Sequence, residues 1–261
     1  MSEPRPAASV LEAGTVAVDA KDGVTSVRFG HPKSNSLPGA LLARLADAIH
    51  TAGARPDTRV LVLRSEGTGA FCAGASFDEF KAVSTPEEGQ RFFSGFAQVI
   101  LAMVRCPCFV VTRVQGKTAG GGIGLVAASD YALAVPEAAL KLSELAVGIG
   151  PFVVGPVIER KIGLAAFSAL AVDADWRSAE WAQAVGLYSE LLDTVPALDF
   201  RVGEFARKLA AYNPDAVKQL KATFWAGTDG WPELLASRAA TSGTLVLGEY
   251  TRRALGGGPT R

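Results

Sequence analysis

The sequence predicts an α/β protein, because strand patterns alternate with helical patterns over about the first 150 residues. Beyond Pro151 only helical patterns follow, which indicates a helical C-terminal part. The length of 261 residues fits one large domain or a core domain with an appendage.

The chain opens with two predicted strands, 15–19 and 24–29, joined by a turn at 21–23 whose Asp-Gly pair favours a hairpin. Apolar residues then recur with helical period over 37–52, which predicts a helix, and the short segment 59–64, RVLVLR, predicts a strand. These four elements place the first helix between two strands.

The remaining elements follow in chain order: a helix 86–103, a strand 108–114, a glycine-dense turn 116–124 leading to a helix that ends near Ser129, short strands 131–135 and 140–142, and a last helix that begins at Trp231. Pro86 suits a first helical position, and Glu87 and Glu88 stabilise the helix dipole in the first turn.

Composition excludes several classes of protein. The 26 basic residues balance the 26 acidic ones without a cluster, so we expect no nucleic-acid partner. No segment is long and apolar enough to predict a membrane span, and the first residues lack a signal-peptide pattern. Three cysteines without framework spacing indicate a reduced, cytoplasmic protein. Cys106 and Cys108 are too close in sequence for ordinary zinc-site spacing, so no metal site is expected.

Several common catalytic schemes lack their residues. With two histidines and no G-x-S-x-G segment, a serine hydrolase triad is disfavoured. The segment 116–118 imitates the end of a phosphate-binding loop, but Val111 stands where that loop needs glycine. The run 122–127 matches a dinucleotide-binding pattern with Glu144 beyond it, although residues 115–121 separate its glycines from the strand. This last pattern stays a weak alternative.

Two loops, 71–77 and 119–124, combine small residues with a following helix. Small side chains let a ligand approach the backbone, and free N–H groups at a helix start point toward it. Two such loops facing each other would form an oxyanion hole with one N–H group from each. The alternative is that the glycines only allow close packing of helix on strand.

With their neighbours these loops resemble the crotonase (enoyl-CoA hydratase/isomerase) superfamily over about residues 14–255. The matching segments are 31–37, 71–80, 116–125 and 142–152, in the order and spacing of that family. The resemblance implies a crotonase-like spiral of ββα units with a C-terminal helical trimerisation region. The predicted division is a mobile tail 1–13, a spiral core with the active site 14–197, a C-terminal helical region 198–255 and a mobile tail 256–261.

The resemblance also implies the site. The backbone N–H groups of Ala75 and Gly121 would hold the thioester oxygen, and Glu144 would be the acid/base, unless it is simply an exposed loop carboxylate. The expected substrate-binding residues are Lys33, Asn35, Ala73, Gly74, Ser76, Phe77, Gly122 and Gly124. Phenylalanines 77, 80, 92, 93 and 96 are expected near the acyl pocket, at least half of them as plain core. No cofactor is expected, because coenzyme A enters as part of the substrate.

One departure from the family concerns the acids. Family hydratases use two glutamates, and here the first position is Gly124. A single base can still move a proton and convert a 3-enoyl-CoA to a 2-enoyl-CoA, and this isomerisation is preferred. Hydration of a 2-enoyl-CoA, hydrolysis or decarboxylation by other chemistry of the family, and a non-catalytic acyl-CoA binder stay open. The family resemblance implies a homotrimer or a dimer of trimers.

Overall fold

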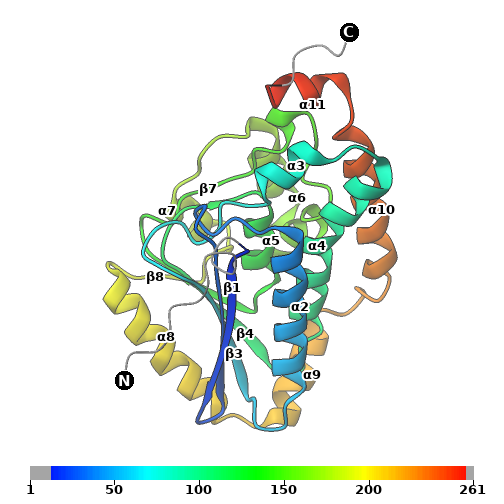
Figure 1. The fold of residues 1–261 in the computed structure, drawn as a ribbon. Helices are drawn as coiled ribbons and strands as arrows, with labels where there is room; N and C mark the ends of the chain where they lie inside the picture. The colour runs from blue at the N-terminus through cyan, green and yellow to red at the C-terminus, as the bar shows by residue number, and fades with distance from the viewer. Residues whose placement is uncertain (1–12, 257–261) are drawn as a thin grey trace, which may run out of the picture.

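The computed structural model of the protein describes residues 13–256 (Figure 1). The predicted tails 1–13 and 256–261 therefore lie outside the described residues, except for Ala13 and Gly256. The main sheet has six strands in the order β1 (Thr15–Lys21), β2 (Val24–Gly30), β3 (Val60–Ser65), β4 (Phe109–Val114), β6 (Tyr131–Ala134) and β8 (Glu190–Leu191). Only β1 and β2 run antiparallel, and every later pairing is parallel.

The β1–β2 hairpin follows from its turn residues. Asp22 and Gly23 both have positive φ, 51° and 80°, as a type I′ turn requires. The pairing of Lys21 with Val24 closes the hairpin directly across this turn. The predicted hairpin is confirmed, with each strand slightly longer than the sequence pattern indicated.

A second layer of short extended segments runs beside the main sheet. It contains β5 (Thr118–Ala119) and β7 (Leu140–Lys141), which pair in parallel. Isolated bridges join further segments to this layer: Leu37 pairs with Ala75, Cys72 with Thr118, and Leu140 with Arg177. Each turn of the chain thus contributes one strand to the main sheet and one short segment to the second layer.

A helix follows each of these strand pairs. After β3 and segment 72–75 come α3 (Phe77–Ala82) and α4 (Pro86–Val104). After β4 and β5 comes α5 (Gly121–Ala128), and after β6 and β7 come the short 3₁₀ turn η1 (Leu145–Val147) and α6 (Gly155–Asp173). This repetition is the predicted spiral of ββα units.

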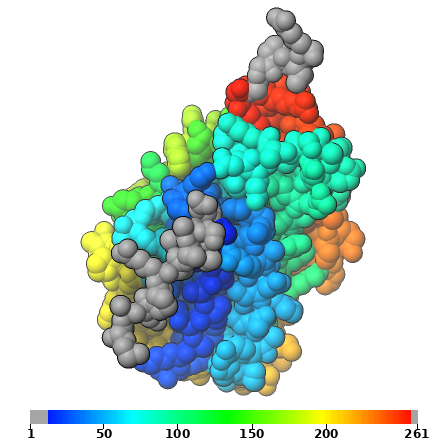
Figure 2. Space-filling model, in the orientation of Figure 1, coloured from blue at the N-terminus to red at the C-terminus, as the bar shows by residue number. Residues whose placement is uncertain are grey.

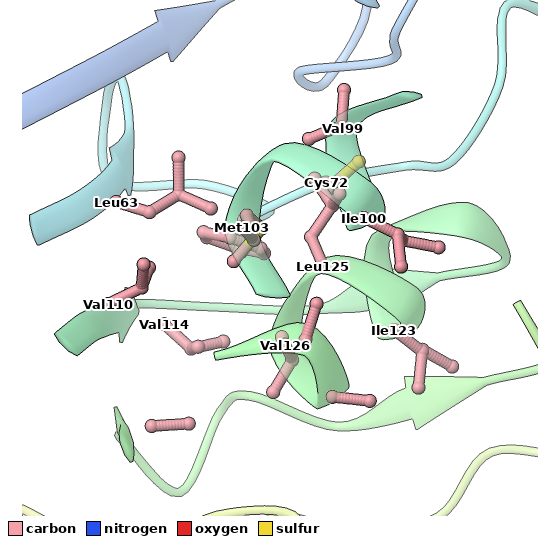
Figure 3. Packing of buried hydrophobic residues seen from close by; sticks show 14 of the residues in the cluster. Leu63, Cys72, Val99, Ile100, Met103, Val110, Val114, Ile123, Leu125 and Val126 are labelled. Carbon is pink, nitrogen blue, oxygen red and sulfur yellow. The ribbon is translucent and has the colours of Figure 1, made fainter. Parts of the chain in front are cut away.

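The core lies between the sheet and the helices of these units. In Figure 1, α2 (Gly39–Ala54) and α4 lie on one side of the strands and α8 (Val195–Ala210) lies on the other. Figure 3 shows side chains of α4, α5 and β4 meeting in this core, among them Ile100, Met103, Val110, Ile123, Leu125 and Val126. Every residue from Gly122 to Ala128 is buried, so α5 has no polar face.

The C-terminal part is mostly helical, as predicted. It contains α6, α7 (Ala179–Ala184), α8, α9 (Pro214–Phe224), α10 (Trp231–Leu245) and α11 (Glu249–Ala254). The expectation that the helix from Trp231 is the last one is wrong, because α11 begins after Gly248. Helix α6 is interrupted at Gly163, which has a non-helical φ of 77°. The two-residue strand β8 lies inside the segment predicted as helical.

Two contacts fix the C-terminal helices on the core. Helix α10 touches α4 through backbone, because a Cβ placed on Gly89 would lie 2.6 Å from Gly243 Cα. In α9, Lys221 Nζ lies 2.8 Å from Asp130 Oδ2 and donates to the carbonyls of Met103 and Cys108, with both charged side chains buried. In Figure 2 the C-terminal segment, in red, lies against the region of α3 and the start of α4.

Across residues 13–256, none of the helices combines the length and the apolar character that a membrane crossing requires. The same residues contain no group of three or more histidine, cysteine or acidic side chains that could hold a metal ion. Cys106 and Cys108 are free thiols with their sulfur atoms 3.5 Å apart.

Candidate active site

A cavity of about 170 Å³ lies where the second-layer loops meet α3, α4 and η1. Its wall is formed by the backbone of 73–75 and 119–121, by the loop 143–154, and by phenylalanine side chains of α3 and α4. Ser143, Glu144 and Ser242 are the polar side chains on this wall within the described part of the chain. The cavity is therefore mainly apolar, with one titratable group.

The short β segments hold the two small-residue loops side by side. Ala119 N donates to Cys72 O at 2.8 Å, and Leu37 N donates to Gly74 O at 2.8 Å. Gly74 and Gly120 have positive φ, 89° and 51°, and a Cβ on Gly120 would lie 4.0 Å from Gly74 Cα. The loops thus touch at their glycines, where a side chain would be strained and crowded.

The two expected oxyanion donors border the same cavity. Among the described residues, the N–H groups of Ala75 and Gly121 have no hydrogen-bond acceptor. Gly121 is the first residue of α5, where N–H groups have no partner within the helix and the dipole favours negative charge. A Cβ on Gly121 would overlap the Phe96 ring, so this position accepts only glycine in the present packing.

Glu144 lies directly beside these loops, at the start of η1. Its Oε1 atom is 3.2 Å from the point where a Cβ on Gly120 would lie, and the residue borders the cavity. The Oε2 atom is buried without a hydrogen-bond partner in the described structure. Burial raises the pKa of Glu144 to about 7, although the backbone N–H groups of Glu144 and Ser143 act in the opposite direction. The Glu144 side chain is therefore half-buried at the cavity and not exposed, and its role as acid/base stays a prediction.

The expected binding residues divide into two groups. Ala73, Gly74 and Phe77 border the cavity. Gly122 and Gly124 do not border it: a Cβ on Gly122 would lie 2.7 Å from Cys72 Cβ, and one on Gly124 would lie 2.6 Å from Val154 Cγ1. These two glycines allow close packing of α5, and their contact with a substrate stays a prediction.

Lys33, Asn35 and Ser76 lie outside this cavity. The Asn35 side chain ties loops together, because Nδ2 donates to the carbonyls of Glu66 and Ala70, both at 2.9 Å. Ser76 caps α3 and, with Lys33, borders a separate polar hollow. Lys33 is exposed and pairs with Asp78, and this ion pair lowers the pKa of Asp78. Their contact with a substrate stays a prediction.

Three further residues of the wall are not among the site residues expected from the sequence. Val147 and Ile149 follow Glu144, and Ser242 comes from α10, almost 100 residues later. Ser242 is brought here by the packing of α10 on α4, which has no local sequence motif.

Comparison with known proteins identifies the family of the chain. The sequence profile of the enoyl-CoA hydratase/isomerase family matches residues 19–246, most of the chain. The chain belongs to this family. The chain is also similar to a probable enoyl-CoA hydratase of Rhodobacter capsulatus. The two sequences are 29% identical over 236 residues, which cover 88% of this chain and 89% of the relative.

Other relatives match shorter stretches. A (7aS)-7a-methyl-1,5-dioxo-2,3,5,6,7,7a-hexahydro-1H-indene-carboxyl-CoA hydrolase of Rhodococcus jostii is 38% identical over 124 residues, or 48% of either chain. A methylglutaconyl-CoA hydratase of Rattus norvegicus is 32% identical over 160 residues, which is 61% of this chain and 50% of the relative. The matched part of this chain thus spans about half the length of these two relatives.

Solved structures show that the family fold is present. An enoyl-CoA hydratase of Bacillus halodurans superposes with a TM-score of 0.86 at 17% identity, covering 92% of this chain and 98% of the other. An enoyl-CoA hydratase of Mycobacterium smegmatis has a TM-score of 0.77 at 30% identity, covering 87% and 88%. The first of these similarities concerns the fold alone.

Proposed function

We propose that the protein acts on an acyl-CoA thioester and forms an enolate at its C2 atom. In this proposal the N–H groups of Ala75 and Gly121 stabilise the thioester oxygen, and Glu144 transfers the proton. The observation that carries the proposal is the position of Glu144. Within the described part of the chain it is the titratable side chain of the cavity, it lies against Gly120, and it has a raised pKa.

The preferred reaction is conversion of a 3-enoyl-CoA to a 2-enoyl-CoA. The Glu144 carboxylate removes a proton from C2, and the electron pair delocalises over the double bond and the thioester carbonyl as a dienolate. The protonated Glu144 then returns a proton to C4, and the double bond moves from C3–C4 to C2–C3. One base serves both steps and ends ionised, so no other reactant is consumed.

The packing around Gly124 supports isomerisation over hydration. Hydration by a pair of carboxylates needs a second acid, and family hydratases place it at this position. Here Gly124 contributes no side chain, and Val154 and Ile100 fill the space in which one would begin. A single carboxylate can shuttle a proton, whereas water addition also requires a separate source for the proton at C2.

A hydrolase is the second candidate, because two of the similar proteins carry a hydrolase name. Relatives 38% and 35% identical to parts of this chain carry the name of a fused-ring carboxyl-CoA hydrolase. In that case Glu144 would remove a proton from water as the water oxygen bonds to the thioester carbonyl carbon, and the two N–H groups would stabilise the tetrahedral oxyanion. The C–S bond would then break, and Glu144 would return the proton to the CoA thiolate that leaves.

Matched substrates distinguish these reactions. Purified protein is given 3-hexenoyl-CoA or crotonyl-CoA, and the absorbance of the conjugated thioester is followed. A rise with 3-hexenoyl-CoA that Glu144→Gln abolishes supports isomerisation. A fall with crotonyl-CoA and no change with 3-hexenoyl-CoA would instead identify a hydratase. No turnover of either, with binding retained, would favour the hydrolase or a non-catalytic acyl-CoA binder.

A further inference from the structure

The cavity wall carries a buried hydroxyl that the proposed chemistry does not use. Ser242, on α10, borders the cavity and is 1% exposed. Its side chain makes no hydrogen bond with the described residues. Its neighbours Thr241 and Thr244 behave differently, because their hydroxyls donate at 3.1 Å to the carbonyls of Ser237 and Ala240, one turn earlier in the helix.

The packing of α10 on α4 places Ser242 on the phenylalanine side of the cavity. The two helices touch at Gly89 and Gly243, and Gly243 is the residue after Ser242. Directly after the end of α10, Val246 packs with Phe80 and Phe92 in an apolar cluster. Because Gly243 packs directly on α4, the preceding residue Ser242 lies at this wall.

An unpaired hydroxyl among apolar side chains is unfavourable unless something in the cavity pairs with it. The other polar side chains of the wall, Ser143 and Glu144, belong to the loop after β7. The wall has no lysine, arginine or histidine among the described residues. A carboxylate at the far end of an acyl group would therefore find no cation, whereas a neutral oxygen could pair with Ser242.

The size of the cavity limits the acyl group. At about 170 Å³ it is close to an engineered cavity of roughly 150 Å³ in another protein that holds benzene. We infer that the preferred acyl group is a compact, mainly apolar unit of about six carbons with one uncharged oxygen, a hydroxyl or ketone, that hydrogen-bonds with Ser242. This inference rests on the proposed function, because it takes an acyl-CoA as the ligand. Ser242 thereby determines specificity.

Binding of unreactive thioesters tests this role without turnover. Calorimetry measures Kd for hexanoyl-CoA and for its 4-, 5- and 6-hydroxy and 5-oxo derivatives, with wild type and with Ser242→Ala. At least one oxygenated thioester should lose roughly tenfold in affinity in the variant, which corresponds to one neutral hydrogen bond. Hexanoyl-CoA should bind the variant as tightly as wild type or more tightly. Thr241→Ala, at the exposed neighbouring position, is the matched control and should change neither.

Several outcomes would overturn the inference. These are equal weakening of all the thioesters by Ser242→Ala, no change in any of them, or tighter binding of glutaryl-CoA than of every oxygenated derivative. Ser242→Cys keeps nearly the same side-chain size and weakens the hydrogen bond, so it should show the same selective loss of affinity for an oxygenated thioester. This variant replaces Ser242→Ala in the test if the alanine variant does not fold. If wild type binds no thioester, the proposed function falls as well. Selective binding without isomerase turnover would overturn the proposed reaction alone.

Discussion

Glu144 is a carboxylic acid in an environment that disfavours its charge. Its Oε2 atom is buried without a partner, and burial raises its pKa from 4.5 to about 7. A base with this pKa is half ionised near neutral pH, so it can both accept and return a proton. The family resemblance predicts this residue beside the glycine loop, where the structure has it, but its burial comes from tertiary packing that no local motif predicts.

Replacing Glu144 by glutamine should remove catalysis and spare binding. We expect kcat for 3-hexenoyl-CoA to fall by roughly 10²- to 10⁴-fold, while Kd for hexanoyl-CoA changes little. In wild type kcat/KM should rise with pH through about 7 and then level off, because the ionised carboxylate is the reactive form. Steady-state kinetics across this range measure both effects. A wild-type profile that is flat through neutral pH would remove Glu144 from the proton transfer.

The same carboxylate should make the fold less stable as pH rises. Its folded pKa lies above its unfolded value, so its contribution is fully present below pH 4.5 and is lost as pH rises through about 7. Glutamine imitates the protonated acid. Relative to wild type, Glu144→Gln should gain about 3 kcal/mol in unfolding free energy between pH 4.5 and 8. Urea unfolding at several pH values measures this gain, and Glu137→Gln, at an exposed position, is the control.

Among the helices, α4 and α10 cross in close backbone contact near the cavity. A Cβ on Gly243 would lie 2.6 Å from Gln90 N. We expect Gly243→Ala to push the helices apart and to cost about 1–3 kcal/mol of unfolding free energy. Gly203→Ala in α8 is the control, because a Cβ there meets only the end of Arg207 at 4.0 Å and should leave stability equal or higher. If Gly243→Ala and Gly203→Ala changed the unfolding free energy equally, the helix crossing would not be a tight contact.

The length of each helix and strand decides whether sequence periodicity can predict it. Strands β1 to β4 and helices α2 and α4 were predicted because each has enough residues for a period of two or 3.6. Strands β5 and β8 have two residues each and exist only through pairing with distant segments, so no periodicity reveals them. Gly124 shows another limit, because the family pattern marks the missing acid but not that Val154 fills the space.

For the whole molecule, the pair of Lys221 and Asp130 joins the C-terminal helices to the core. Lys221→Met would leave Asp130 buried without its cation, which typically costs about 3–5 kcal/mol. Chemical denaturation should show this loss. Lys218→Met, at an exposed position of the same helix, should change stability little. A loss below about 1 kcal/mol for Lys221→Met would mean that Asp130 finds other partners or becomes neutral.

The trimer or dimer of trimers implied by the family resemblance stays a prediction. Large apolar side chains are exposed on the chain, including Leu164 and Val172 on α6 and Phe200 on α8. Burying such surface between subunits would be favourable. Light scattering of the purified protein should therefore give a mass three or six times that of the chain. A monomer at micromolar concentration would contradict this assembly.

Because α5 is buried over its whole circumference after Gly121, nearly every substitution in it disturbs the core. Its amino end is therefore a fixed support, held against Phe96. Glu144 instead belongs to a short turn in which Leu145 and Ala146 are exposed. Substitutions in this turn should therefore lower the stability of the fold less than substitutions in α5. New reactions on this scaffold would arise most readily by changing the turn while the proposed amide donors stay in place.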